Sequence, residues 1–251
     1  MKNLSDYFGR NINRKRIVIT GGTTGIGKDT AELLASLGGN VFIFGRDKDD
    51  FDQAIADIKQ QAEGDVCGIT ADITRREDIE LIWQEIDQTL GGIDILINNA
   101  ALPAGGINDE EYENIKYIID TNVIGYISFA KEAVIRMKAH GHGHIVNIGS
   151  MSAEVKEETG TVYVATKSAI RGFSAALRKE VNSEGIKVSH IEPGSVISDM
   201  QPAPKEEQWD KMKKMEMLKA EDIAMSVLFC LSQPLRCDVV TIQVRPHLQI
   251  I

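Results

Sequence analysis

The sequence predicts an α/β fold in which a doubly wound parallel sheet of about seven strands carries helices on both faces. Short apolar runs rich in β-branched residues alternate with longer amphipathic stretches along most of the 251-residue chain. The short runs are typical of strands buried on both faces, and the long stretches are typical of the helices that cover them. Right-handed crossovers between parallel strands then place helices on both sides of one sheet.

The length and composition of the chain fit one domain. Hydrophobic residues make up 43% and charged residues 26% of the chain, which is ordinary globular usage. No internal repeat, low-complexity tract or Pro/Gly-rich linker divides it. We therefore expect a single domain over residues 1–251, with an N-terminal extension at 1–14. The least regular segment, 194–219, follows a late strand and is expected to be a substrate loop.

Seven short apolar segments are expected to be strands, and six segments with helical spacing are expected to be helices. Thr74 with Glu77 three residues later has the pattern of a capping box at one helix start. In chain order the expected strands are Arg16–Thr20, Val41–Phe44, Val66–Thr70, Ile93–Asn98, His144–Ile148, Lys187–Ile191 and Val239–Val244. The expected helices are Ile26–Leu37, Asp49–Ala62, Arg75–Leu90, Glu110–Ala139, Thr161–Ser183 and Glu221–Leu231.

The formal net charge of −9 disfavours nucleic acid and anionic membrane surfaces as partners, because both need a cationic face. The chain begins with a polar segment that lacks the apolar core of a signal peptide, and no apolar run has the length of a membrane span. Cys67, Cys230 and Cys237 form no Cys-x-x-Cys pair and are interpreted as reduced thiols. The expected location is cytoplasmic.

A glycine-rich turn follows the first expected strand and precedes the first expected helix. It reads Thr20-Gly21-Gly22-Thr23-Thr24-Gly25-Ile26-Gly27. A helix N-terminus reached through such a turn presents free N–H groups to a pyrophosphate, and a side chain at Gly21 or Gly27 would obstruct the phosphates or the helix–strand packing. A ligand-free turn is the alternative. No Lys-Ser/Thr follows the last glycine, which excludes a Walker loop.

Three further positions lie where later strands end. Arg46 occupies the place where a dinucleotide fold meets the adenosine ribose, so an arginine favours the 2′-phosphate of NADP over NAD, although Asp47 beside it weakens that argument. The alternative is a solvated turn arginine. Asp72 is either an acceptor for the adenine amino group or an ordinary turn aspartate before a helix. Asn99 and Ala100 close the fourth strand, where polar groups either line a cofactor cleft or simply favour a turn.

Tyr163 and Lys167 are four residues apart on an expected helix and therefore share a face. An adjacent ammonium favours phenolate and would lower the tyrosine pKa, which would make Tyr163 a usable acid or base. The spacing alone is common on solvated helix faces. Ser150 follows the fifth strand, where we expect its hydroxyl to donate to a substrate carbonyl, and Asn122 is expected to bind a water or join a relay.

Together these motifs resemble the short-chain dehydrogenase/reductase family, in its compact single-domain branch with a Rossmann-type fold. The resemblance covers roughly residues 14 to 246 and is carried by the joint order of the motifs. The matching motifs are Thr20-Gly21-x-x-x-Gly25-Ile26-Gly27, Asp72, Asn98-Asn99-Ala100, Asn122, Ser150, Tyr163-x-x-x-Lys167 and Pro193-Gly194. The chain departs from the family pattern at Ala101, where glycine is common, and in a charged loop at 151–160.

The resemblance implies catalytic roles for four residues. Tyr163 would be the acid in reduction and the base in oxidation, and Lys167 would lower its pKa and bind the nicotinamide ribose. Ser150 would orient the substrate carbonyl, and Asn122 would hold a water that links Lys167 to solvent. The implied cofactor-binding residues are Gly21, Thr23, Thr24, Gly25, Ile26, Gly27, Arg46, Asp72, Ile73, Asn99, Ala100, Tyr163, Lys167, Pro193, Gly194, Val196 and Ser198. The family also implies a homodimer or homotetramer.

The predicted function is an oxidoreductase that moves a hydride between NADP(H), or NAD(H), and the carbonyl or hydroxyl carbon of a small molecule. The alternatives are a catalytically silent NADP(H)-binding redox sensor and a structural oligomer with a vestigial nucleotide site. The alternating His140, His142 and His144 invite a metal site, but no Cys or carboxylate lies among them, and a polar turn is the preferred interpretation. No metal is expected.

Overall fold

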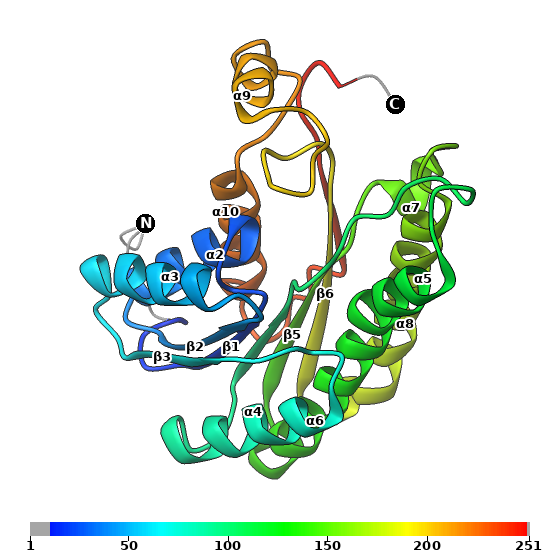
Figure 1. Cartoon of the computed structure of the whole chain (residues 1–251). Helices are drawn as coiled ribbons and strands as arrows, with labels where there is room; N and C mark the ends of the chain where they lie inside the picture. Colours follow the sequence, from blue (N-terminus) through cyan, green and yellow to red (C-terminus); the bar gives the residue numbers. More distant parts are fainter. Residues whose placement is uncertain (1–10, 250–251) are drawn as a thin grey trace.

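The computed structural model describes residues 11–249 and shows one sheet of seven strands, all parallel, with helices on both sides (Figure 1). The strand order is β3-β2-β1-β4-β5-β6-β7, so the order reverses between β1 and β4. The predicted fold class is confirmed. The strands are β1 (Arg16–Thr20), β2 (Asn40–Gly45), β3 (Val66–Thr70), β4 (Ile95–Asn98), β5 (Gly143–Ile148), β6 (Ile186–Pro193) and β7 (Thr241–Val244).

Helices cover both faces of this sheet. Figure 1 shows α2, α3 and α10 on one side and α4, α6 and α8 on the other. The α-helices are α2 (Gly25–Ser36), α3 (Lys48–Gln61), α4 (Arg76–Thr89), α5 (Tyr112–Ile119), α6 (Tyr126–His140), α7 (Ser152–Val155), α8 (Thr161–Val181), α9 (Lys205–Lys213) and α10 (Ala220–Leu231). A π-helix, η1 (Asp120–Gly125), joins α5 to α6, and a 3-10 turn, η2 (Asn182–Glu184), follows α8.

Two hydrophobic clusters separate along the strands, because successive side chains of a strand point to opposite faces. In β1, Ile17 and Ile19 belong to the cluster beneath α2 and α10, while Val18 belongs to the cluster beneath α4, α6 and α8. All three side chains are fully buried. Burial on both faces explains why the central strands read as continuous apolar runs in the sequence.

The segment expected to be one helix over Glu110–Ala139 is interrupted. The helix begins at Tyr112, and the i→i+5 pattern of η1 replaces one stretch of ordinary helix at Asp120–Gly125. A Cβ at Gly125 would lie 2.9 Å from Ile73 Cδ1, so the widened turn packs against the β3–α4 connection where no side chain fits. Apolar spacing over a single turn does not separate a period of 3.6 from a wider one.

The capping box expected at Thr74 and Glu77 was wrong. The α4 helix begins at Arg76, and its N-cap residue, Arg75, makes no side-chain cap hydrogen bond. The Thr74 hydroxyl instead donates to Asp72 Oδ1 at 2.8 Å. A local Asx turn therefore competes successfully with the helix start for this hydroxyl group.

The segment 194–219 has its own structure beyond the carboxyl ends of the strands, where Figure 1 shows α9 beside the C-terminal segment. An isolated parallel bridge pairs Val196 with Leu218, and Leu248 N donates to Met215 O at 2.9 Å. The expected N-terminal extension falls mostly on residues 1–10, which lie outside the described residues. Ile12, within 11–14, is fully buried in the core beneath α2.

Candidate active site

The glycine turn after β1 leaves the first turn of α2 open to a ligand. The N-cap residue, Thr24, makes no side-chain cap hydrogen bond, and the first turn of α2 contains no acidic residue. The N–H groups of a helix start and its positive dipole end favour an anion. Gly27 is required for packing, because a Cβ there would lie 2.1 Å from Gly21 O. These features fit a dinucleotide pyrophosphate.

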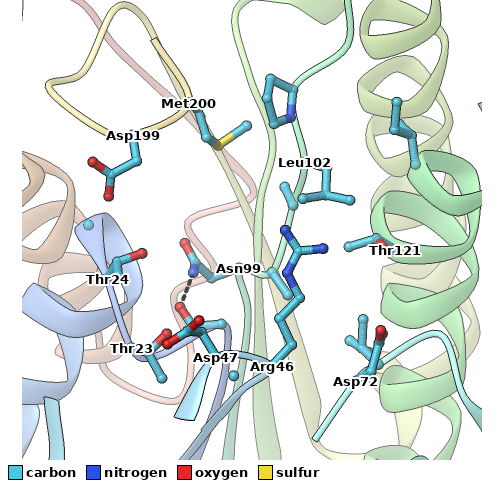
Figure 2. A pocket seen from close by; sticks show the side chains of 18 of the residues that line it. Thr23, Thr24, Arg46, Asp47, Asp72, Asn99, Leu102, Thr121, Asp199 and Met200 are labelled. Carbon is cyan, nitrogen blue, oxygen red and sulfur yellow. Dashed lines mark hydrogen bonds between the residues drawn. The ribbon is translucent and has the colours of Figure 1, made fainter. Parts of the chain in front are cut away.

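A cavity of about 780 Å³ lies in front of this turn, between the ends of β1, β2, β3 and β4 (Figure 2). Its size and position at the reversal of strand order suit an adenosine diphosphate moiety. Of the residues predicted to bind cofactor, Gly21, Thr23, Thr24, Gly25, Ile26, Arg46, Asp72, Ile73, Asn99, Ala100 and Ser198 line it. Gly27 does not, which agrees with a packing role.

Asn99 joins the glycine turn to the end of β4. Its side-chain nitrogen donates to Thr20 O at 3.1 Å and to Gly21 O at 2.9 Å. The Thr20 hydroxyl oxygen in turn accepts from the backbone N–H groups of Asn99 and Ala100, each at 2.9 Å. These bonds hold the two strand ends of the switch point together and fix one wall of the cavity.

Arg46 reaches across the cavity from the end of β2 toward α5 (Figure 2). One of its terminal nitrogens donates to the hydroxyl oxygen of Tyr117 at 2.9 Å, and Tyr117 Oη donates to Asp72 Oδ2 at 2.7 Å. Tyr117 was not predicted from the sequence, because its helical position resembles that of any partly exposed aromatic residue. The Arg46 side chain is exposed and therefore accessible to a phosphate.

Both carboxylate oxygens of Asp72 already accept hydrogen bonds from the protein. Oδ1 accepts from the backbone N–H of Thr74 at 2.9 Å and from its hydroxyl, while Oδ2 accepts from Tyr117. Burial raises the pKa of Asp72, but the hydrogen bonds from Thr74 and Tyr117 outweigh burial and lower it. Of the two interpretations left open, the bonds of Oδ1 are those of a turn aspartate. Only Oδ2, which accepts from Tyr117, remains for the proposed bond from an adenine amino group.

A second cavity, of about 320 Å³, adjoins the first and contains the expected catalytic groups. Asn99, Ser198 and Met200 line both cavities, so the two share a wall. From the predicted site, Ser150, Tyr163, Lys167, Pro193, Gly194 and Val196 line the second cavity. Residues that sequence reasoning had not selected also line it, including Ser152, Glu157, Gln201 and Gln249.

Lys167 lies under the floor of this cavity, 2% exposed. Its Nζ donates to Ile148 O at 3.1 Å and lies 5.6 Å from the centre of the Tyr163 ring and 5.4 Å from that of Tyr126. Burial lowers the pKa of Lys167 to about 7, because the interior disfavours its charged form. The ammonium is therefore only partly populated at neutral pH.

The pKa of Tyr163 is raised in the described structure, where the sequence predicted a lowered value. Burial raises the pKa of Tyr163 to about 12, and the interaction with the Ser150 hydroxyl opposes this only in part. Desolvation of the phenolate is the largest cause, the charge of Glu157 adds to it, and Lys167 is not among the groups that lower this pKa. Ser150 Oγ also donates to Ser152 Oγ at 3.0 Å.

The carboxamide of Asn122 is used within the protein and lines neither cavity. Its Nδ2 donates to Leu102 O at 2.9 Å and to Thr166 Oγ1 at 3.2 Å, while Oδ1 accepts from Leu102 N at 2.7 Å. The side chain, fully buried in η1, therefore anchors the segment after β4 to α8. Both N–H groups of the carboxamide are therefore used within the protein.

The three alternating histidines have separate environments. His144 is buried and its Nε2 lies 2.9 Å from Ser189 Oγ, whereas His142 Nε2 lies 3.2 Å from Asp94 Oδ1. Burial lowers the pKa of His144 to about 3. Among residues 11–249, no group of three or more His, Cys, Asp or Glu side chains is arranged to hold a metal ion.

The family model described as short chain dehydrogenase matches residues 15–209. The chain belongs to the short-chain dehydrogenase family. Like other members, this dehydrogenase is an oxidoreductase acting on CH–OH and C=O groups. All the motifs that carried the resemblance in the sequence lie within the matched range, with the glycine turn near its start.

Relatives of this dehydrogenase include proteins named uncharacterized oxidoreductase. One from Staphylococcus aureus is 35% identical over 92% of this chain and 97% of its own length, and one from Staphylococcus saprophyticus is 30% identical over the same shares. Among solved structures, a variant of actinorhodin polyketide ketoreductase with NADPH matches at a TM-score of 0.82 and 26% identity. It covers 93% of this chain and 96% of the other.

A short-chain type dehydrogenase/reductase from Mycobacterium marinum gives a TM-score of 0.86 at 25% identity, covering 97% of this chain and 98% of that one. The share of this chain that these structures cover is larger than the range 15–209 that the family model matches. Within the described residues, none of the helices of this dehydrogenase combines the length and apolar character needed to cross a membrane.

Proposed function

We propose that this dehydrogenase transfers a hydride between NADP(H) and the carbonyl or hydroxyl carbon of a small molecule, with Tyr163 as the acid or base. The observation that carries the proposal is the shared wall between the two cavities. Tyr163, Ser150 and Lys167 line a cavity that opens onto the glycine-turn cavity at Asn99. A nicotinamide reaching this wall would lie within reach of a substrate oxygen held by Tyr163 and Ser150.

The bound nicotinamide would supply the hydride chemistry, and the chain would supply alignment and proton transfer. The free N–H groups at the start of α2 would hold the pyrophosphate. Asn99 and Ala100 would lie along the cofactor on one side. The residues proposed around the nicotinamide on the other side are Pro193, Gly194, Val196 and Ser198.

Tyr163 is suited to donate a proton when the substrate is reduced. With a pKa raised to about 12, its hydroxyl is protonated throughout the neutral range. Ser150 would orient the substrate oxygen by donating a second hydrogen bond. Lys167, with its pKa near 7, would bind the nicotinamide ribose and stabilise phenolate when its amine is charged. Asn122 would act through the bonds of its carboxamide, which hold the segment after β4 against α8.

NADP is proposed over NAD because Arg46 lines the adenosine end of the first cavity and is exposed to it. A guanidinium pairs well with a 2′-phosphate, and the Tyr117 hydroxyl holds it across the cavity. The structural relative solved with NADPH is compatible with this choice.

We also propose a cytoplasmic homodimer or homotetramer. Support for the assembly comes from exposed apolar side chains along one helical surface, which a second copy would cover. Support for the location is limited to the three free thiols and the acidic composition. The exposed apolar residues of this surface are Tyr112, Ile119, Ile124, Ile127 and Ile135.

A substrate panel tests the proposal. Aldehydes, simple ketones, α-diketones such as 2,3-butanedione, and the matching alcohols are incubated with NADPH, NADH or their oxidised forms, while nicotinamide absorbance is followed. We expect turnover of at least one carbonyl compound, faster at equal concentration with NADPH. Tight NADPH binding without turnover of any compound would favour a redox sensor instead. Failure to bind either dinucleotide in calorimetry would favour a structural oligomer.

A further inference from the structure

A carboxylate and an imidazole that the proposed chemistry does not use lie buried near the end of β6. Glu192 is fully buried and His190 is 3% exposed. Being two residues apart on a strand, they point to the same face, which is the face that α8 covers at Val188. Along residues 11–249, Glu192 is the carboxylate with the lowest exposure among the buried polar residues.

Glu192 contacts groups from two further elements and from its own strand. Arg171 of α8 places Nε 3.2 Å from Glu192 Oε1, and Gln243 of β7 donates from Nε2 to Oε2 at 3.0 Å. His190 Nε2 lies 3.3 Å from Oε1. Arg171 also pairs with Glu154 of α7. The carboxylate therefore links β6, β7 and α8 directly, and α7 through Arg171.

The contacts with Arg171 and His190 lead to segments that carry proposed reacting groups. Arg171 follows Lys167 by one helical turn, as Lys167 follows Tyr163, so the three share one face of α8. The His190 ring packs against the backbone just before Ser150, because a Cβ on Gly149 would lie 2.5 Å from His190 Nε2. Glu192 itself immediately precedes Pro193, which lines the second cavity.

The arrangement is a poor one for stability alone. His190 Nε2 and Glu192 Oε1 lack a hydrogen bond, although both are buried. Burial lowers the pKa of His190 to about 4, and the charge of Lys167 contributes, so the ring is neutral at pH 7 and offers Glu192 no full charge. A well-packed apolar set usually stabilises a core as well as a buried ion pair does. Imperfect polar burial beside a site points to a functional constraint.

We infer that Glu192 is a positioning residue, which through Arg171 and His190 fixes the reactive face of α8 against the turn that carries Ser150. The inference rests on the proposed function, since it assigns Glu192 a part in aligning Tyr163 and Ser150 on one substrate oxygen. Glu192 touches neither substrate nor cofactor in this scheme. Its effect is on geometry, to which proton and hydride transfer are sensitive.

The first test is Glu192→Gln, which keeps the shape and removes the charge. Because a displacement of about 1 Å can cost about 100-fold in rate, we expect kcat to fall about 10- to 100-fold. The KM for the best carbonyl compound of the panel and the Kd for NADPH should stay within about twofold, because the cofactor-binding groups are untouched. The matched control is Asp94→Asn, another buried arginine-paired carboxylate, which should keep full kcat.

A second variant separates positioning from stability. Arg171→Met leaves Glu192 as an uncompensated buried charge and should lower the urea midpoint. Glu192→Gln combined with Arg171→Met removes both charges and should recover much of that midpoint. Under the inference, the double variant keeps the kcat deficit of Glu192→Gln. A purely structural role predicts instead that kcat and the urea midpoint recover together.

Two results would overturn the inference. One is that the kinetic constants of Glu192→Gln stay within twofold of the parent, and the other is that the double variant recovers kcat together with stability. Tyr163→Phe, assayed in parallel with the same compound, distinguishes this from failure of the proposed function. If Tyr163→Phe turns over at the parental rate, the proposed function fails. If Tyr163→Phe is inactive while Glu192→Gln is fully active, only the role of Glu192 fails.

Discussion

Two buried carboxylates, each paired with an arginine and near a histidine, lie at opposite ends of the sheet. Asp94 precedes β4 at the amino ends of the strands, and Glu192 lies near the carboxyl end of β6. Asp94 Oδ2 accepts from the backbone N–H of Arg16 at 2.9 Å and from its Nε at 3.0 Å, and Oδ1 accepts from its Nη2 at 2.8 Å. Glu192 Oε1, by contrast, has Arg171 as a charged neighbour but no aligned donor.

The difference shows how the two ends of the sheet are used. At the amino ends, a buried charge is retained where its hydrogen bonds are complete, so it contributes stability. At the carboxyl ends, buried charges remain incompletely paired, and they lie beside the two cavities. Departures from ideal packing are expected to cluster at one edge of the sheet when the residues there must serve a functional site as well as the stability of the fold.

The largest expected effect is that of Tyr163→Phe. Because a positioned acid–base group contributes about 10²- to 10⁴-fold, we expect kcat to fall about 1,000-fold with NADPH binding unchanged. The matched control is Tyr126→Phe, which removes a second buried hydroxyl near Lys167, one that donates to Ile148 O at 3.0 Å. The control should lose some stability and keep its turnover. Equal losses of kcat in both variants would contradict the assignment of Tyr163.

Asp94→Asn tests the other side of the comparison. Burial raises the pKa of Asp94, but hydrogen bonds from Arg16 outweigh it and lower the pKa from 3.8 to about 2. This shift corresponds to roughly 2 kcal/mol of stability at neutral pH, which the asparagine would lose. Urea unfolding of the parent and variant at pH 7 measures the difference. A fall in kcat with unchanged stability would reverse the roles that we assign to the two ends.

The pH dependence of this contribution has a definite sign. A carboxyl whose pKa is lower in the folded state stabilises the fold above its unfolded pKa, here 3.8. That stabilisation is lost as pH falls from 3.8 through about 2. The difference in unfolding free energy between parent and Asp94→Asn should therefore be constant above pH 5 and shrink below pH 4. A difference that persists unchanged at pH 2 would contradict this.

The smallest expected effect is on cofactor choice. Arg46→Ala should weaken NADPH about tenfold and NADH less than about twofold, as loss of one exposed charge-assisted phosphate contact implies. Lys48→Ala is the control, because Lys48 is a nearby cation that pairs with Asp52 and does not line the cavity. Fluorescence titration of each reduced cofactor gives the ratio. Equal weakening of both cofactors would reject the 2′-phosphate assignment.

The sequence predicted the parts of the fold that depend on local pattern. The alternating apolar runs located all seven strands, and the glycine turn at Gly21–Gly27 predicted where the first cavity lies. Tyr163, Lys167 and Ser150 lie on one cavity wall, as the joint motif implied. These features can be predicted because hydrophobic period, turn chemistry and the positions of strand ends are determined by residues close together in the sequence.

Features set by contacts distant in sequence were missed or misjudged. The pKa of Tyr163 depends on how deeply α8 is buried, which spacing does not reveal. The π-helix at Asp120–Gly125 reflects packing against Ile73. His190 and Glu192 did leave a signal, since two ionisable residues at i and i+2 of a strand share one face. The role proposed for Glu192 depends on its contact with Arg171 of α8, which the sequence does not reveal.

The wall common to the two cavities has a kinetic consequence. A nicotinamide ring bound against Asn99 and Ser198 would form one side of the smaller cavity. A carbonyl compound would therefore find a complete binding site only after the dinucleotide had bound. The compound that leaves last would be the oxidised dinucleotide. Steady-state kinetics should then show a compulsory order, with NADP⁺ as a competitive product inhibitor against NADPH and a noncompetitive one against the carbonyl compound.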